Sequence, residues 1–269
     1  MIRSFLLSSG SLKVLHRGNM NRFLCVVLGL SLTSVVLHSA MQERELTVSV
    51  VIPCVPKHAP HLLNLLGHYA RQTELPQEVI ISLSRVDLIP KNLTDTLEKQ
   101  NWPFKLVLIR NIQKTSAGKN RNLGAQAATG DILMFQDADD IPHPQRVEIV
   151  KYFFSNYDIY HLMHFYVVPK RIANNGEVPE ECVRYKKNEI SFRIGAHYQE
   201  STEHYPFHNG QPCVLRKIAA KIMWPDQYTV AEDVAYSRYI YAHFRDKTII
   251  VEAPLIVYRN QLTSGWPSL

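Results

Sequence analysis

Three aspartates, Asp137, Asp139 and Asp140, stand close together directly after an apolar run at residues 132–135. Carboxylates this close repel one another unless a cation or another donor neutralises them. Mg²⁺ and Mn²⁺ prefer oxygen ligands, and proteins commonly hold them with one or two carboxylates plus substrate phosphates. The simpler interpretation is an acidic turn that caps the next helix. The apolar run favours the metal site, because it predicts a buried strand that ends at the carboxylates.

A buried strand needs a sheet around it. Apolar or β-branched runs predict strands at 48–52, 78–81, 105–109 and 132–135, and helices are predicted at 61–70, 92–100, from residue 117, and at 144–154. Strands that alternate with helices form βαβ units. We therefore expect an α/β fold, an open, mostly parallel Rossmann-like sheet with flanking helices, in one domain over residues 46–269. Ligands bind such sheets just outside the carboxyl ends of the strands.

The sequence argues against a dinucleotide-binding fold, a phosphate-loop ATPase and a nucleic-acid-binding protein. No Gly-x-Gly-x-x-Gly follows the first strand and no Gly-Lys-Ser/Thr loop occurs, although dinucleotide-binding proteins and phosphate-loop ATPases need them. The chain has 30 Lys and Arg against 24 Asp and Glu, but four of the basic residues precede residue 41, where there is no acidic residue. The rest of the chain is therefore nearly neutral, which argues against a nucleic-acid partner.

The first 40 residues differ from the rest of the chain. Residues 23–40 carry no formal charge, and Arg17 and Arg22 precede them. This length lies between that of a signal-peptide core and that of a membrane-spanning helix. His38 suits a cleavage site poorly, so we favour a signal anchor at 23–40 with a basic cytoplasmic tail at 1–22. The C-terminal domain of this single-pass membrane protein would lie in the secretory-pathway lumen; secretion after cleavage is the alternative.

Cysteine and histidine show no metal-ligand spacing. There is no Cys-x-x-Cys pair to suggest zinc. Cys182 and Cys213 form a disulfide in an oxidising lumen or stay buried thiols, and the sequence leaves both open. We expect the histidines, including His161 and His164, near an acceptor groove or at the surface.

Five segments together carry a family resemblance. In chain order they are Val48–Pro53, Gly118-x-x-Arg121-Asn122-x-Gly124, Gly130-Asp131, Asp137-Ala-Asp-Asp140 and Ala231-Glu-Asp233. They resemble glycosyltransferase family 2, whose members have the nucleotide-diphospho-sugar transferase (GT-A) fold. The resemblance covers about residues 46 to 260 and is strongest up to residue 150. It implies a metal-assisted transfer of a sugar from a nucleotide-diphospho-sugar to an acceptor hydroxyl, with inversion at the anomeric carbon.

The resemblance also implies roles for single residues. Asp139 would hold Mn²⁺ or Mg²⁺, and Asp137 would contact the ribose or the metal, which stabilises the departing nucleoside diphosphate. Asp233, or Glu232 beside it, would be the general base that deprotonates the acceptor hydroxyl, although both also suit the first turn of a helix. The other positions expected to bind the nucleotide-sugar are Pro53, Ser84, Arg121 and Asn122. For Arg121 the alternative is a surface position on an amphipathic helix.

Three positions depart from the family pattern. Relatives place a Thr and an aromatic residue after the first strand and a uracil-reading Asp pair after the second, but this chain has Cys54-Val-Pro56 and Ser82-Leu-Ser84. A serine hydroxyl lacks the charge-assisted bond of a carboxylate. UDP is therefore the default donor nucleotide, with GDP and others open. Gln261 stands where relatives often offer a His, which puts a third protein ligand to the metal in doubt.

Other functions remain as alternatives. A catalytically inactive relative that binds a nucleotide-sugar or a glycan is the first, and the intact Asp137, Asp139 and Asp233 favour the enzyme over it. A nucleotidyltransferase would need a Gly-rich, Arg-containing loop after the first strand, and none is present. The acceptor is a glycan, a lipid or a protein, and no pattern in the sequence selects among them.

Overall fold

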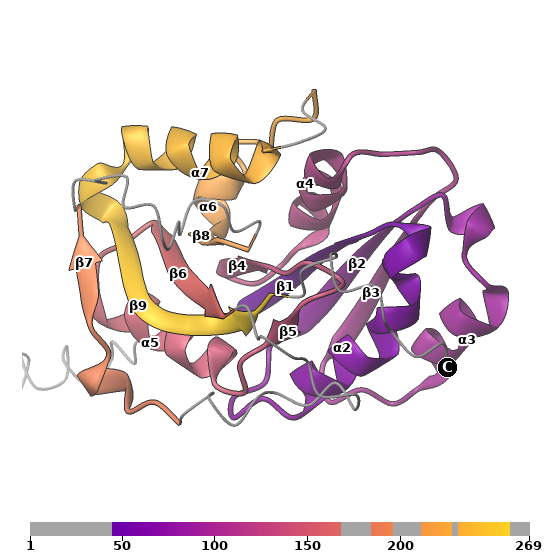
Figure 1. The fold of residues 1–269 in the computed structure, drawn as a ribbon, viewed down its shortest axis with the longest axis horizontal. Coiled ribbons are helices and arrows are strands. Elements are labelled where there is room, and N and C mark those ends of the chain that lie inside the picture. The colour runs from indigo at the N-terminus through magenta and orange to yellow at the C-terminus, as the bar shows by residue number, and fades with distance from the viewer. Residues whose placement is uncertain (1–44, 168–183, 196–210, 228–230, 259–269) are drawn as a thin grey trace, which may run out of the picture. The chain divides into compact units, whose positions relative to one another are not determined.

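A computed structural model describes residues 45–167, 184–195, 211–227 and 231–258 (Figure 1). Residues 23–40, Cys182 and Gln261, for which the sequence made predictions, lie outside these ranges. Glu45–Leu269 forms one compact unit. In the part of the chain described, no helix is long and apolar enough to cross a membrane.

The first half of the unit alternates strands and helices, as the sequence predicted. Its elements in chain order are β1 (Val48–Cys54), η1 (Pro56–His61), α2 (Leu62–Ala70), β2 (Glu78–Ser84), η2 (Val86–Leu88), α3 (Lys91–Lys99), β3 (Lys105–Asn111), α4 (Ala117–Ala127) and β4 (Ile132–Phe135). Strands β1, β2 and β4 are buried along their whole length. This burial explains why their sequences are apolar runs rather than alternating patterns.

The second half is less regular. Its elements are β5 (Ile141–Pro142), α5 (Arg146–Asn156), β6 (His161–Val167), η3 (Lys187–Glu189), β7 (Phe192–Ile194), β8 (Cys213–Leu215), α6 (Arg216–Ala219), α7 (Glu232–His243), η5 (Arg245–Lys247) and β9 (Thr248–Val257).

All described strands join one mixed sheet in the order β3-β2-β1-β4-β8-β6-β9-β5, with β7 paired to β9. The pairs β1–β2, β2–β3, β1–β4 and β6–β9 are parallel, whereas β4–β8, β6–β8, β5–β9 and β7–β9 are antiparallel. The expectation of a mostly parallel sheet is therefore correct only for the first half. The pairing partners of the later strands lie far away in sequence, so local patterns do not reveal their direction.

Helices cover both faces of the sheet (Figure 1). Alternate residues of β1 face opposite layers: Val50 and Ile52 pack in the core with α2 and α5, and Val51 packs with α4 and α7. Helix α4 approaches β1 very closely at Gly124, where an added Cβ would lie 2.4 Å from Cγ1 of Val51. This close approach brings the side chains at the start of α4 to the carboxyl end of β1.

Two predictions about buried residues need correction or completion. His161 and His164 on β6 are buried, 0 % and 1 % exposed, and not at a surface. No alternating pattern in the sequence would have marked them as buried, because Leu162 and Met163 between them are buried too. Cys213 is a buried free thiol.

Glu78 at the start of β2 is a fully buried carboxylate that ties three strands and a loop together. Its carboxylate accepts hydrogen bonds from Ser49 Oγ (2.7 Å), Thr129 N (2.6 Å) and Thr129 Oγ1 (2.9 Å), and pairs with Lys105 Nζ at 3.3 Å. Burial alone would raise the pKa of Glu78, but these donors outweigh it and lower the pKa below its ordinary value of 4.5.

We therefore expect Glu78→Gln to lower the free energy of unfolding by about 1–3 kcal/mol at pH 7, because buried donors lose their charged acceptor. A carboxyl with a lowered pKa stabilises the fold above its unfolded pKa and loses that contribution as pH falls through its folded pKa. Denaturant titrations at pH 7 and at pH 3 should show the difference from wild type shrinking in acid. The control is Glu98→Gln, in an exposed pair with Arg110, which should change stability by less than about 1 kcal/mol. A Glu78 effect independent of pH would contradict this account.

Candidate active site

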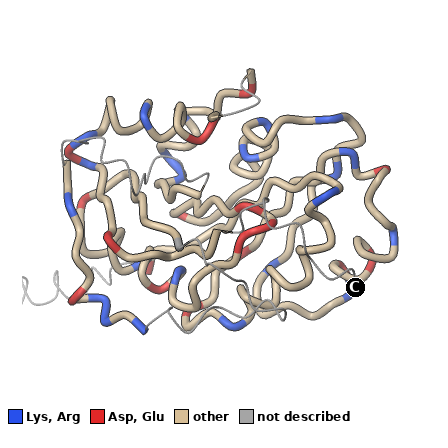
Figure 2. Tube along the Cα trace, viewed as in Figure 1, with Lys and Arg blue, Asp and Glu red and all other residues tan. Residues whose placement is uncertain are grey.

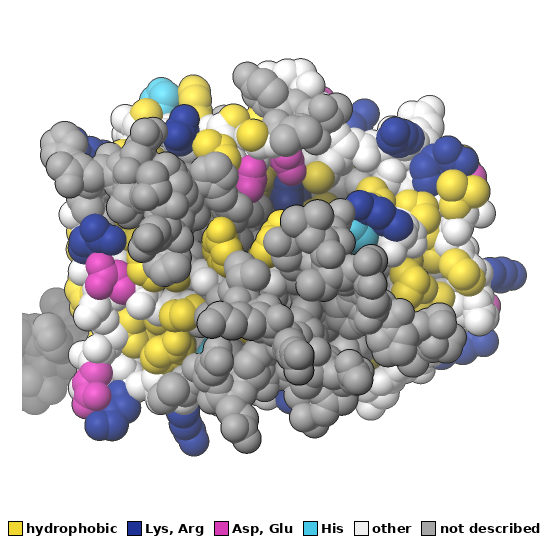
Figure 3. All heavy atoms as spheres, in the orientation of Figure 1, with side chains coloured by type: hydrophobic (Ala, Val, Ile, Leu, Met, Phe, Trp, Pro, Cys, Tyr) yellow, Lys and Arg dark blue, Asp and Glu magenta, His cyan; other side chains and the backbone are white. Residues whose placement is uncertain are grey.

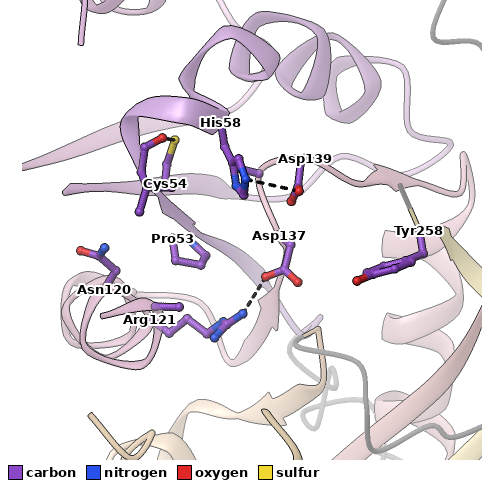
Figure 4. Close-up of a pocket in the computed structure, with 11 residues that line it drawn as sticks. Pro53, Cys54, His58, Asn120, Arg121, Asp137, Asp139 and Tyr258 are labelled. Atoms are coloured by element: carbon purple, nitrogen blue, oxygen red, sulfur yellow. Dashed lines mark hydrogen bonds and ion pairs between the residues drawn. The ribbon is translucent and has the colours of Figure 1, made fainter. Parts of the chain in front are cut away.

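A cavity of ≈ 210 Å³ opens where β1 and β4 end, at the carboxyl edge of the sheet (Figure 4). Strands β1 and β4 are parallel neighbours, so the segments that follow them lie together. The residues that line the cavity are Pro53, Cys54, Val55, His58, Ala117, Asn120, Arg121, Asp137, Ala138, Asp139 and Tyr258. The site therefore lies where ligands bind in open α/β sheets.

Asp137 and Asp139 both line this cavity, as the apolar strand before them predicted. Nε2 of His58, from η1, lies 3.5 Å from Oδ2 of Asp139. Burial lowers the pKa of His58, and nearby Asp139 only partly opposes this effect. His58 is therefore mainly neutral at pH 7, and its imidazole leaves most of the negative charge of Asp139 uncompensated.

Arg121 on α4 joins the two acidic segments that the sequence singled out. Its Nη2 donates to Oδ1 of Asp137 at 2.6 Å, and its Nη1 donates to Oε1 of Glu232 at 2.9 Å. Burial alone would lower the pKa of Arg121, but the two carboxylates outweigh it and raise the pKa. The guanidinium is thus a fixed buried cation, and the alternative of a surface position is wrong, since Arg121 is 3 % exposed.

An aromatic cluster supports this arginine. The Arg121 guanidinium lies over the ring of Trp224, 4.3 Å from its centroid, and Trp224 stacks on Tyr236 of α7 at 4.1 Å. Asn122 fixes the backbone of Trp224, because its amide donates to Trp224 O (2.9 Å) and accepts from Trp224 N (2.8 Å). Such cation–π and stacking contacts hold the guanidinium in one orientation.

Asp233 follows Glu232 in the first turn of α7, where the helix dipole favours a carboxylate. Its Oδ1 accepts a hydrogen bond from Val234 N at 2.8 Å. Burial raises the pKa of Asp233, and the charges of Glu232 and Asp137 add to this effect while Val234 and Arg121 oppose it. A carboxylate with a raised pKa is suited to accept a proton.

Helix α4 directs its amino end at the cavity. Ser116 caps the helix by accepting a hydrogen bond from Lys119 N at 3.1 Å, and Ala117, the first helical residue, lines the cavity. The amino end of a helix carries partial positive charge and free N–H groups, so it is a favourable place for a phosphate.

Behind the cavity, polar side chains from β2, β3 and α4 form a buried network around the Asn120 amide. Oδ1 of Asn120 accepts hydrogen bonds from Ser82 Oγ (2.9 Å) and Thr115 Oγ1 (2.8 Å), and Nδ2 of Asn111 lies 3.5 Å from it. Ser84 Oγ accepts from Thr115 N at 2.9 Å. The two serines that replace the family's Asp pair therefore bond to protein groups.

The donor set fits a hard divalent cation held partly by its substrate. Asp137 and Asp139 offer carboxylate oxygens from one wall of the cavity, and such metals commonly take one or two carboxylates plus phosphates. Cys54 is no ligand of this kind, since burial, together with Asp139, raises the pKa of its thiol to about 12. Within the ranges described, no three His, Cys, Asp or Glu side chains come together to hold a metal by themselves.

Charge elsewhere on the domain is dispersed. Lys and Arg occur around the periphery of the described trace rather than in one stripe (Figure 2). On the face shown in Figure 3, the coloured basic side chains lie mostly toward the edges, with acidic ones among them. This distribution agrees with the near-neutral domain deduced from composition.

The structure thus brings Pro53, Arg121, Asp137 and Asp139 to one cavity and links them through Arg121 to Glu232 and, next to it, Asp233. Asn122 and Ser84 lie outside the lining, so their contacts with a nucleotide stay predictions. The lining residues that sequence reasoning missed are His58, Asn120 and Tyr258. Only Asn120 stands within a segment that carried the family resemblance, at an unspecified position of Gly118-x-x-Arg121.

Comparisons with known proteins agree with this geometry. The family model described as "Glycosyl transferase family 2" matches residues 49–210, more than half of the chain. An uncharacterized glycosyltransferase of Haemophilus influenzae is 33% identical over 103 residues, a match that spans 38% of this chain and 33% of that protein.

Two solved structures have a similar fold. S. aureus TarS (residues 1–349) in complex with UDP has a TM-score of 0.59 at 16% identity, with 79% of this chain and 60% of that chain covered. Glucosyl-3-phosphoglycerate synthase from Mycobacterium tuberculosis, in complex with Mn²⁺, UDP and glucosyl-3-phosphoglycerate, has a TM-score of 0.52 at 17% identity, with 83% and 75% covered. At such identities the likeness shows the fold. With the family match over residues 49–210, it shows that the chain belongs to glycosyl transferase family 2.

Proposed function

We propose that this protein transfers a sugar from a UDP-sugar to an acceptor hydroxyl, with inversion at the anomeric carbon. One observation carries the proposal: Arg121 connects Asp137, beside the cavity, to Glu232, next to Asp233. A nucleotide-binding wall and a candidate base therefore belong to one site. The UDP and Mn²⁺ in the structure of the similar mycobacterial synthase, and the UDP in that of TarS, support the choice of donor.

Asp233 is the proposed general base. Its carboxylate would take the proton of the acceptor hydroxyl while the oxygen attacks the anomeric carbon, and the sugar–phosphate bond on the opposite side breaks. Partial burial suits Asp233 to this role, because a raised pKa makes its carboxylate a better proton acceptor. Glu232 holds Arg121 at 2.9 Å and is better placed to orient the guanidinium than to accept a proton.

The leaving group is a nucleoside diphosphate, whose negative charge grows as the sugar departs. The amino end of α4 and Arg121 both line the cavity and would stabilise this charge. Asp139, with Asp137, would hold Mn²⁺ or Mg²⁺, and a bound cation of this kind neutralises phosphate charge. Arg121 and the amino end of α4 would position the diphosphate. The 2.6 Å bond from Arg121 keeps Asp137 in a single orientation.

The function is tested by turnover. The full chain, incubated with Mn²⁺, a panel of UDP- and GDP-sugars and an array of glycan acceptors, should release UDP from at least one UDP-sugar in an acceptor-dependent manner. Product linkage by NMR should show an inverted anomeric configuration. Nucleotide-sugar binding without turnover on any acceptor would instead support the inactive, binding relative. A retained configuration would contradict the single displacement.

Asp233→Asn should lower kcat by about 10²–10⁴-fold, the usual contribution of a general base. Wild-type activity should fall in acid as pH decreases through the pKa of Asp233, which burial raises above the ordinary 3.8. A raised carboxyl pKa means that ionised Asp233 opposes folding at neutral pH, so the variant should keep or gain free energy of unfolding. Asp158→Asn, at an exposed surface pair, is the control and should leave kcat unchanged. A loss of stability in parallel with activity would indicate a structural role instead.

Asp139→Asn should reduce activity by about 10²-fold or more and raise the Mn²⁺ concentration needed for half-maximal rate, because one carboxylate ligand is lost. A chelator should abolish wild-type turnover, and added Mn²⁺ or Mg²⁺ should restore it. Activity that survives both the chelator and the substitution would remove the metal from the proposal and leave the transferase assignment standing.

A further inference from the structure

The side chain of Asn120 has an unusual place in the cavity wall. It is 0 % exposed, and yet it lines the cavity. Three donors surround its oxygen, from Ser82, Thr115 and Asn111. Its Nδ2, in contrast, has no hydrogen-bond partner within the part of the chain that the structure describes. A buried donor without a partner lowers stability, so it calls for a ligand.

The cavity lining contains both neutral and charged side chains. Asn120, with Pro53 and Cys54 near it, lies at the opposite end of the view from Tyr258, and the two aspartates lie between (Figure 4). The Cys54 thiol stays protonated at neutral pH, since burial raises its pKa to about 12. Asn120 is therefore a neutral amide donor near the uncharged Pro53 and Cys54, while Arg121 and the two aspartates carry the charge of the lining. A nucleoside diphosphate has the same division between its base and its phosphates.

The serines that replace the uracil-reading aspartates do not supply a second base contact. Ser82 stands beside Pro53 in the sheet register, but its hydroxyl donates to Asn120 Oδ1. The Ser84 hydroxyl is bonded to Thr115, and neither serine lines the cavity. Asn111 completes the arrangement, since its amide nitrogen, a donor only, approaches both Ser82 Oγ and Asn120 Oδ1 at 3.5 Å. These donors orient the Asn120 amide with its oxygen inward and its nitrogen toward the cavity.

We propose that Asn120 is the base-reading residue of this site and that its Nδ2 donates a hydrogen bond to a ring carbonyl of the pyrimidine. The proposal rests on the proposed function, which supplies the UDP-sugar. It deepens that function as follows. The carboxylate of the family's Asp pair would accept from the N–H of the base, whereas the Asn120 amide donates to a carbonyl of the base. Uracil and cytosine share the carbonyl at the 2-position, but cytosine has an amino group, a donor, where uracil has its second carbonyl at the 4-position. CDP should therefore bind more weakly than UDP only if Asn120 contacts the 4-position.

The test measures binding of UDP, 2-thio-UDP, 4-thio-UDP, CDP, GDP and ADP to the full chain by calorimetry in the presence of Mg²⁺. Sulfur is a poor hydrogen-bond acceptor, so one of the two thio analogues should bind wild type about fivefold or more weakly than UDP. This arm needs no variant and holds even if the substitutions do not fold. Equal binding of UDP and both thio analogues would overturn the proposal.

Asn120→Asp keeps the acceptor for Ser82, Thr115 and Asn111 and replaces only the Nδ2 donor. It should weaken UDP binding by about tenfold or more at pH 8 and remove the preference for UDP over the weaker thio analogue. Unchanged or tighter UDP binding by this variant would show that residue 120 accepts a hydrogen bond from the base instead of donating one. Asn92→Asp, the same change at an exposed position of α3, is the control and should bind UDP as wild type does.

The failures of the two proposals are separable. If no nucleoside diphosphate binds wild type, the proposed function fails and the role of Asn120 fails with it. If UDP binds wild type but both the thio analogues and Asn120→Asp leave its affinity unchanged, only the role of Asn120 is overturned. Selective binding of GDP or ADP would refute the pyrimidine and the UDP-sugar together.

Discussion

The architecture of the site depends on one buried cation. Arg121 has almost no contact with solvent, and among the described residues its charge is balanced by carboxylates from two distant segments, Asp137 and Glu232. A buried charge without its partners costs several kcal/mol, so neither carboxylate can move away alone without penalty. This requirement fixes the start of α7 against the end of β4, and with it the position of Asp233. The arrangement of the candidate site is thus set by electrostatics at a point where the backbone offers no continuous sheet or helix.

Several packing features serve to bring that cation into place. Helix α4 can lie against β1 because Gly124 has no Cβ, and Gly118 allows the backbone of Pro225 to approach, since a Cβ there would lie 2.7 Å from its carbonyl oxygen. Trp224, the residue before Pro225, has its ring centroid 4.3 Å from the guanidinium carbon of Arg121. The glycines of the Gly118-x-x-Arg121-Asn122-x-Gly124 segment are therefore best understood as steric conditions for placing Arg121, with Asn122 holding Trp224.

The sequence predicted the parts of this arrangement whose causes are local. Buried strands such as β1 and β4 are apolar runs, and the carboxylates after β4 follow directly from where that strand ends. Arg121 and Asn120 stand side by side in α4, but only the first had a motif to mark it. The role proposed for Asn120 depends on Ser82, Thr115 and Asn111, which converge on it from separate elements. His58 likewise meets Asp139 only through the fold. The antiparallel half of the sheet was missed for the same reason, because its pairings join segments far apart in sequence.

The charges that line the cavity bear on how a metal ion and a nucleotide would bind. Two of the cavity-lining residues, Asp137 and Asp139, are acidic and one, Arg121, is basic. Arg121 is already shared with Glu232, so its single charge cannot offset the aspartates and a diphosphate as well. A diphosphate entering this site would meet net negative charge at close range, where the interaction costs more than in water. A divalent cation would offset this charge, and the phosphates that bring the extra negative charge would also bring oxygen ligands for it. In the proposed function, cation and donor would therefore bind as one unit, with Asp139, beside His58, as the carboxylate that receives them.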